Sequence, residues 1–136
     1  MNLVSQSLSG LPSFLVYFAL ALALLTVFVV IYGRITPYDE RTLIREGNVA
    51  AAISLAGAIL GFTLPLASAI AHSVSIVDML LWGLVALVAQ VAVYLAVSRA
   101  MPRFAEAIRA GKTAAATLLA ALAVAVGLLN AACMTY

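Results

Sequence analysis

Charged side chains are scarce in this chain. Only 9% of its 136 residues are Asp, Glu, Lys or Arg, whereas 66% are apolar, and the mean hydropathy is +1.20. A soluble globule of this size needs more polar surface than such a composition can supply. The composition therefore excludes a soluble protein and predicts one that lies in a lipid bilayer.

Other shortages exclude whole classes of site. The single cysteine, Cys133, cannot form an intramolecular disulfide. The basic residues are interleaved with acidic ones and form no polybasic run, so we expect no nucleic acid partner. No cluster of titratable or metal-ligating side chains stands out, so we expect no metal, no cofactor and no catalytic residue.

Four apolar stretches are each long enough to cross a hydrocarbon core, which takes roughly 20 helical residues. They run over about 14–33, 49–70, 76–98 and 113–135. The thirteen residues before the first stretch contain no Lys or Arg, so the charged region of a cleavable signal is missing and we expect this helix to be retained. The predicted fold is all-α: a polytopic membrane protein with four transmembrane helices in one integral membrane domain, 1–136.

The positions of the basic residues predict the orientation. All seven Lys and Arg lie within 34–45 and 99–112. Because basic residues near the ends of a span stay on the cytoplasmic side, we expect 34–48 and 99–112 to be cytoplasmic loops. Both termini and the turn around 72–78 then lie on the outer side, which is an N-out, C-out topology.

The chain also repeats itself at a spacing of 64 residues. Residues 44–47 (Ile-Arg-Glu-Gly) align with 108–111 (Ile-Arg-Ala-Gly), and the alanine triplet 50–52 aligns with 114–116. We therefore expect two tandem two-helix units, about 14–70 and 76–135. Since each unit crosses twice, both enter the membrane in the same direction and are related by an axis along the membrane normal.

Helix starts are indicated at three points. Thr36 is placed to cap a helix that begins at Pro37, and Pro102 is placed to begin the equivalent helix of the second unit. Ser75 and Asp78 have the spacing of a capping box at the start of the third crossing, where a carboxylate also meets the positive end of the helix dipole.

The second and fourth crossings are rich in small residues. Gly57 and Gly61 form a GxxxG step, and Ala123 and Gly127 have the same spacing. In lipid, helices associate through close backbone approach, which small side chains permit. These two helices are predicted to form the packing centre.

Polar residues in the outer half of the membrane allow two interpretations. Gln90 needs a partner, either across a helix interface or in a solute. Pro65 cannot donate to the carbonyl of Gly61, so it either bends the helix or leaves that oxygen for a ligand. The functional interpretation is a small polar cavity open to the outer side, lined by Gly61, Thr63, Pro65, Ser68, Gln90 and Asn130.

Two further features have a functional and a structural interpretation. His72 and Asp78 are the only ionisable pair on the outer face; they are too few for a metal site, and we expect a surface pair at headgroup level. Cys133 is a candidate for lipidation or intermolecular crosslinking, although a small apolar residue at a packed helix end is favoured.

Taken together, several motifs resemble a known family. They are Ile35-Thr36-Pro37, Pro65-Leu66 with Ser68-Ala69, Val74-Ser75-Ile76 with Asp78, Trp82-Gly83 with Gln90, Met101-Pro102 and the closing Asn130-Ala131-Ala132-Cys133-Met134-Thr135. From about Tyr17 to the last residue the chain resembles the YjfL-like family of bacterial inner-membrane proteins, also described as UPF0719 or domain of unknown function 350. The resemblance implies a multi-pass protein of the bacterial inner (plasma) membrane with four helices in two tandem units. It also implies, by gene neighbourhood, a membrane-stress protein or an ATP-grasp ligase as partner.

Three functions follow, in order of preference. The first is a small non-enzymatic membrane protein that forms a homo-oligomer and serves an envelope-associated or membrane-stress system. The second is a passive channel or transporter for a small solute, an ion or a polyamine, against which stands the absence of a charged residue within the membrane. The third is an enzyme acting on a lipid or an envelope precursor, which lacks positioned acids and bases.

Overall fold

The computed structural model describes residues 2–134, and these contain helices and no strands. Four long helices form the molecule: α2 (Leu11–Ile35), α4 (Val49–His72), α5 (Ile76–Ala100) and α7 (Thr113–Cys133). Each is long and apolar enough to cross a membrane, and the first span continues back through α1 (Leu3–Leu8). Two six-residue helices, α3 (Glu40–Arg45) and α6 (Phe104–Arg109), connect them. The prediction of an all-α protein with four candidate membrane spans is confirmed.

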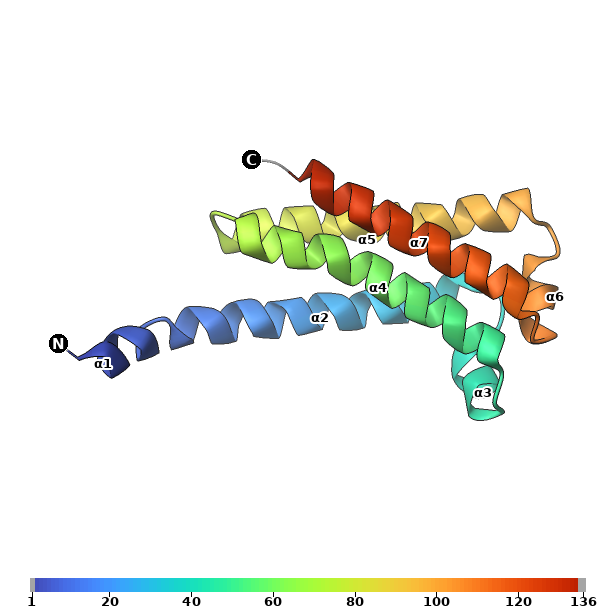
Figure 1. The fold of residues 1–136 in the computed structure, drawn as a ribbon, viewed down its shortest axis with the longest axis horizontal. Helices are drawn as coiled ribbons and strands as arrows, with labels where there is room; N and C mark the ends of the chain where they lie inside the picture. The colour runs from blue at the N-terminus through green and yellow to red at the C-terminus, as the bar shows by residue number, and fades with distance from the viewer. Residues whose placement is uncertain (1, 135–136) are drawn as a thin grey trace.

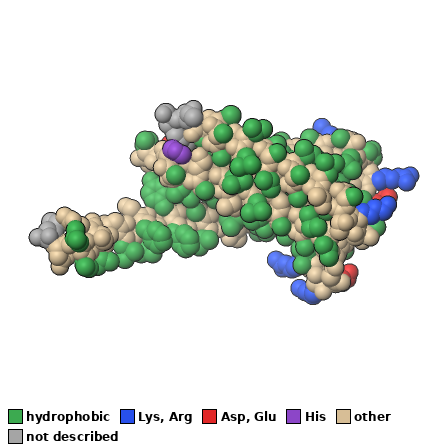
Figure 2. All heavy atoms as spheres, viewed as in Figure 1, with side chains coloured by type: hydrophobic (Ala, Val, Ile, Leu, Met, Phe, Trp, Pro, Cys, Tyr) green, Lys and Arg blue, Asp and Glu red, His purple; other side chains and the backbone are tan. Residues whose placement is uncertain are grey.

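The spans run alternately in opposite directions. As a result, α3 and α6 lie at one end of the bundle, while α1, the α4–α5 turn and the last turn of α7 lie toward the other (Figure 1). The basic side chains gather at the α3 and α6 end and the histidine lies at the opposite end (Figure 2). We call these the basic end and the His72 end.

Helices α4 and α7 form the centre of the molecule because their glycines let the two backbones touch. Gly57 lies against Ala120, Gly61 against Ala123, and Gly127 against the backbone of Gly61. A Cβ atom at any of these glycines would overlap the facing helix. Since lipid supplies no hydrophobic force between helices, this close approach decides which pair packs.

The two short helices end alike. Gly47 (φ 88°) and Gly111 (φ 78°) adopt the left-handed conformation that glycine favours. The N–H of the next residue then reaches back to a carbonyl five residues earlier, from Asn48 to Leu43 at 2.8 Å and from Lys112 to Ala107 at 2.9 Å. Both turns and both helix starts differ by 64 positions (104 − 40 and 113 − 49), which is the spacing of the sequence repeat.

The starts of the short helices differ from the predictions. Helix α3 begins at Glu40, and its cap is Asp39, whose side chain accepts the N–H of Thr42 at 3.3 Å. Thr36 does not cap a helix at Pro37, because its hydroxyl donates to the side chain of Glu40 instead. Helix α6 begins at Phe104 rather than at Pro102.

The start of α5 agrees with its prediction, since the Ser75 hydroxyl accepts the N–H of Asp78 at 3.1 Å. The outer bounds of the spans differ slightly. Helix α2 begins at Leu11, three residues before the predicted start, with Pro12 in its first turn. The predicted end of the last span, Thr135, lies outside the described residues.

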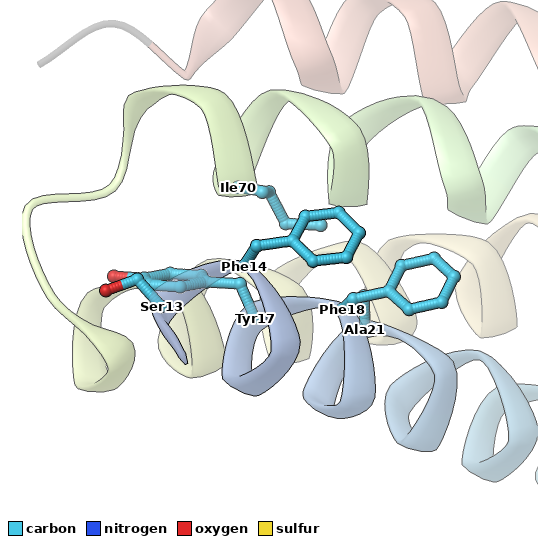
Figure 3. Close-up of a pocket in the computed structure, with 6 residues that line it drawn as sticks. All are labelled: Ser13, Phe14, Tyr17, Phe18, Ala21 and Ile70. Carbon is cyan, nitrogen blue, oxygen red and sulfur yellow. The ribbon is translucent and has the colours of Figure 1, made fainter. Parts of the chain in front are cut away.

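Helix α2 is the least covered of the four long helices. It lies mainly against α4 and α5, and it diverges from α4 toward the His72 end (Figure 1). The divergence leaves an apolar gap of about 320 Å³ between Ile70 of α4 and the stacked rings of Phe14 and Phe18, whose centroids are 5.5 Å apart (Figure 3). Most apolar side chains of α2 therefore face the surroundings of the protein.

Candidate functional site

A buried polar cluster lies at the basic end, where the chain leaves α2 and enters α3. Thr36 and Glu40 are each only 6% exposed. The Thr36 hydroxyl donates to Oε1 of Glu40 at 2.6 Å. Within the described part of the chain, Glu40 is the only buried acidic residue, and no basic side chain forms a salt bridge with it. The cluster therefore holds a carboxyl group that lacks a counter-charge.

The surroundings of Glu40 change its acidity. Burial raises the pKa of the Glu40 carboxyl above its ordinary value of 4.5; the hydrogen bond from Thr36 opposes this rise, and the nearby charge of Asp39 adds to it. The exposed Asp39 behaves in the opposite way, because hydrogen bonds from Thr42 lower its pKa. Two adjacent carboxyl groups thus differ in the ease with which they lose a proton.

Aromatic rings pack beneath this cluster. Tyr94 of α5 meets both Tyr32 of α2 and Phe104 of α6 edge-on, with centroid distances of 5.5 and 6.3 Å. The hydroxyls of Tyr32 and Tyr38 are buried and have no hydrogen-bond partner among the described residues. Burying a hydroxyl without a hydrogen-bond partner lowers the stability of the fold by on the order of 1–3 kcal/mol. These hydroxyls are therefore able to form further hydrogen bonds.

Two contacts from the second half of the chain fix the cluster in place. The guanidinium of Arg109 donates to the carbonyl of Pro37. Asn48 caps α4 by accepting the N–H of Ala51 at 3.0 Å, and its amide nitrogen donates to the carbonyl of Ile108 at 2.8 Å. Helix α6 therefore contacts the segment between α2 and α3 through Pro37 and the start of α4 through Asn48.

A cavity of about 420 Å³ opens beside Glu40, between α2, α3 and α4. Its polar part is formed by Asp39, Glu40 and Arg41 at the start of α3. Its apolar part is formed mainly by Val29, Val30 and Leu55 on the two spans. Oε2 of Glu40 lies 3.8 Å from the place where a Cβ of Gly33 would be, and Gly33 lines the same cavity. The carboxyl oxygen that does not accept from Thr36 therefore lies beside a residue that lines this cavity.

The residues that the sequence predicted to line an outer-half cavity lie away from the Glu40 cluster. Two of them, Gln90 and Gly61, meet at the α4–α7 contact. Gln90 is 2% exposed, and its amide nitrogen donates to the carbonyl of Ala123 at 3.0 Å. Its Oε1 lies 2.8 Å from the position that a Cβ of Gly61 would take. The side chain therefore fills the junction of α4, α5 and α7, and its amide is not left unpaired.

Pro65 is buried within α4 and leaves the Gly61 carbonyl without a backbone donor. Gly127 of α7 lies against this oxygen, with a Cα hydrogen directed at it. A Cα–H···O contact is a weak hydrogen bond, so it compensates in part for the missing one. The released carbonyl thus belongs to the helix contact.

The other predicted outer-half residues do not form one group. The Ser68 hydroxyl donates to the carbonyl of Ala131 at 3.3 Å, next to Asn130, whose buried amide nitrogen has no partner among the described residues. Thr63 is exposed and donates to Ile59 of its own helix. Ser68 therefore contacts Ala131, the residue after Asn130, whereas Thr63 lies on the surface.

Near the His72 end, each ionisable residue has a local role. Nδ1 of His72 lies 2.9 Å from the carbonyl oxygen of Ser68, one turn earlier. The carboxylate of Asp78 accepts the N–H of Val74 at 3.2 Å, across the α4–α5 turn. Cys133 is exposed at the end of α7. No group of three metal-ligating side chains occurs in the described residues.

Comparison with known proteins identifies the family. The model of a family described as Domain of Unknown Function (DUF350) matches residues 6–134. The chain belongs to this family. It is also 41% identical over 129 residues to the UPF0719 inner membrane protein YjfL of Escherichia coli K12, and to the same protein of strain O157:H7. The matched part covers 95% of this chain and 98% of each relative. No solved structure matches this DUF350 member.

The sequence analysis did not single out Glu40, because an acidic residue in a short connecting segment is ordinarily exposed to solvent. One signal was present in the sequence. At the repeat spacing of 64, Glu40 aligns with Phe104 (40 + 64), and an aromatic residue at the equivalent position indicates a buried site. The structure agrees, since Phe104 is 2% exposed. In this DUF350 protein, positions 40 and 104, which are 64 residues apart, are both buried and carry different chemistry.

Proposed function

We propose that this protein is a non-enzymatic inner-membrane protein that self-associates in the plane of the membrane and serves as the membrane component of an envelope-associated system. One observation carries the proposal: the bundle leaves a groove of small residues open between α4 and α7, while α2 stays largely uncovered. Close contact between small residues is the main way in which helices associate in lipid. The described residues contain no group of three His, Cys, Asp or Glu side chains that could hold a metal ion.

The groove runs along α4 and α7 and has a volume of about 630 Å³. Small residues, among them Ala56, Gly57, Ala120 and Ala121, line it together with the larger side chains of Ile53, Leu60, Val124 and Leu128. A helix placed there would approach both backbones closely. Lipid chains cover such a surface less completely than a complementary helix does, because they do not interlock with its small side chains.

The repeat suggests which helix fits. Helix α5, which begins the second unit, contacts both α4 and α7. A twofold relation between the units would place α2 against the opposite side of the α4–α7 pair. In the structure α2 instead lies mainly against α4 and α5, so this position is open. We infer that α2 of a second copy occupies it, which gives a head-to-tail contact able to close into a ring.

The proposed orientation places the basic end in the cytoplasm. Exposed Arg residues at both short helices support it, because basic residues in short connections are retained on that side. Both termini then lie in the periplasm, as the alternating spans require.

Subunit counting tests the assembly. We expect the protein in lipid nanodiscs to be larger than a monomer by native mass spectrometry, and we expect Ala56→Leu combined with Ala121→Leu to reduce it to a monomer by filling the groove. The matched control is Ala92→Leu, at an exposed alanine of α5, which should leave the assembly unchanged. A monomeric unmodified protein, or a groove variant that assembles normally, would contradict the proposal.

A crosslink tests the identity of the occupant. On a Cys133→Ala background, Val27→Cys of α2 and Ala121→Cys of the groove lie at a similar depth from the basic end. We expect an intermolecular disulfide between separately expressed, differently tagged copies. Moving the first cysteine to Ala92 of α5 should abolish it; a disulfide of equal yield there would argue against α2 as the occupant.

Asn130 favours a second candidate function, a passive path for a small solute. Its buried amide nitrogen is unpaired among the described residues and could contact a polar solute. In this case flux in proteoliposomes would fall in Asn130→Leu and in Gln90→Leu while assembly stays intact. Absence of flux in the unmodified protein would dispose of this candidate.

A further inference from the structure

We propose that the cavity beside Glu40 binds a membrane amphiphile whose headgroup carries a primary ammonium next to a phosphate, as phosphatidylethanolamine does. This goes beyond self-association, because it assigns a ligand to a site in each copy. Three observations carry it: a buried carboxyl that forms no salt bridge among the described residues, an arginine, Arg41, in the lining of the same cavity, and an apolar wall that continues along two membrane spans.

The carboxyl defines the cationic part of the ligand. Glu40 is 6% exposed, and only its Oε1 has a hydrogen-bond donor, Thr36. Oε2 lies 3.8 Å from the Cβ position of Gly33, which lines the cavity, and no other side chain of the described residues donates to it. A primary ammonium offers three N–H donors together with a positive charge, whereas a quaternary ammonium offers the charge alone. A primary amine therefore satisfies both needs of this oxygen.

The remaining polar residues define the rest of the headgroup. Arg41 lines the cavity one residue after Glu40, and a guanidinium binds phosphate oxygens in a bidentate manner. With both carboxylates ionised, Asp39, Glu40 and Arg41 carry a net charge of −1. A zwitterion whose ammonium faces Glu40 and whose phosphate faces Arg41 matches this arrangement; a purely anionic headgroup does not.

The apolar wall argues for a lipid rather than a soluble amine. Val29 and Val30 belong to the span of α2 and Leu55 to that of α4, so the wall lies at the depth of acyl chains. The charged residues lie where these spans end, at the depth of headgroups. Burial also raises the pKa of Glu40, which indicates that its ionised form lacks compensation that a bound ammonium would supply.

Lipid titration of the full-length protein, followed by native mass spectrometry, tests the site. We expect phosphatidylethanolamine to bind at least tenfold more tightly than phosphatidylglycerol or phosphatidylcholine with the same chains. Glu40→Gln should lose about tenfold in phosphatidylethanolamine affinity and lose the preference. Its control is Glu106→Gln, an exposed glutamate of α6 at the same end, which should bind like the unmodified protein. Equal binding by the Glu40 and Glu106 variants would overturn the assignment.

A second variant covers the case in which Glu40→Gln fails to fold. Val30→Trp fills the apolar part of the cavity from an exposed position and leaves the carboxyl intact, so it should also weaken phosphatidylethanolamine about tenfold. Unchanged affinity in this variant counts against the site.

Phosphoethanolamine, which has the headgroup without chains, distinguishes the source of the amine. Weak binding, at least a hundredfold below that of the lipid, supports an amphiphile. Binding of comparable strength would show that the site takes a soluble amine and would refute the lipid assignment. Because each of these measurements reports lipid affinity and not subunit number, its failure is distinguishable from failure of self-association.

Discussion

Glu40 shows how one side chain can differ from its neighbours in the same segment. Asp39 caps α3 from an exposed position, whereas Glu40, the next residue, lies under Thr36 and against the aromatic layer. The two side chains carry the same kind of acidic group, and their surroundings shift the two pKa values from their ordinary values of 3.8 and 4.5. Their pKa values consequently move in opposite directions.

The raised pKa of Glu40 predicts a dependence of stability on pH. The folded protein binds the Glu40 proton more tightly than the unfolded chain, so its contribution to stability is complete below about pH 4.5 and is lost as the pH rises through the folded pKa. We expect Glu40→Gln, which cannot ionise, to become more stable relative to the unmodified protein across this window. Unfolding free energies measured from pH 4 to 8 in detergent check it. Glu106→Gln serves as the control, and a flat difference for Glu40→Gln would contradict the prediction.

Glycine has opposite roles at two positions of this molecule. A Cβ at Gly127 would overlap the backbone of Gly61, whereas a Cβ at Gly33 would make an ordinary contact 3.8 Å from Glu40. We expect Gly127→Ala to destabilise the fold by at least about 1–3 kcal/mol, because backbone atoms cannot move aside. Gly33→Ala should stabilise it by about 0.5–1 kcal/mol through helix propensity. Unfolding free energies that shift alike in both variants would contradict this contrast.

At the scale of elements, α4 and α7 follow similar turns but have different caps. Asn48 precedes α4 with φ −75° and ψ 101°, and Lys112 precedes α7 with φ −76° and ψ 101°. Asn48 accepts a backbone N–H of its helix, whereas Lys112 makes no side-chain cap. The backbone at position 112 is therefore already arranged for a capping side chain that the sequence does not supply.

This difference predicts a stabilising substitution. Lys112→Asn should add a cap to α7 and raise the unfolding free energy by about 1 kcal/mol, in the range usual for such caps. Lys112→Ala is the matched control, because it removes the same charge without adding an acceptor. The difference between the two variants isolates the cap, and equal stabilities would show that the asparagine fails to form it.

At the scale of the whole molecule, charge is segregated along the long axis. The basic residues occupy one end, and the apolar surface of four spans lies between that end and the α4–α5 turn (Figure 2). Such a molecule has one favourable depth in a bilayer. The side on which each end lies is then set by the basic residues.

Labelling of single cysteines in intact cells checks the orientation. On a Cys133→Ala background, Val74→Cys in the α4–α5 turn is 88% exposed and should react with a membrane-impermeant maleimide from the periplasm. Ile44→Cys and Ala110→Cys, at the basic end, should react only after permeabilisation. None of these substitutions changes a charge, so the determinants of orientation stay intact. Labelling of either basic-end site in intact cells would reverse the proposed topology.

Different parts of the structure were predictable to different degrees. The spans, the Ser75 cap and the membrane location follow from hydropathy and local spacing, which are properties of contiguous residues. The predicted start of α3 was wrong. Thr36 and Pro37 have the local pattern of a helix start, but the Thr36 hydroxyl donates to Glu40 and the helix begins at Glu40. The outer-half cavity stays a prediction: its members Gln90 and Gly61 meet at a helix contact, and Thr63 lies on the surface.

By itself the sequence determined that this chain crosses a membrane four times, with its basic residues gathered at one end, because the transfer of apolar and charged side chains between water and lipid depends on each residue and its near neighbours. Only the tertiary structure decided that Glu40 is buried beside a cavity and that α2 diverges from α4. Both outcomes depend on contacts between segments far apart in the chain, such as Arg109 with Pro37 and Asn48 with Ile108. Packing selects such contacts from shape and hydrogen bonding in three dimensions, which no local pattern records.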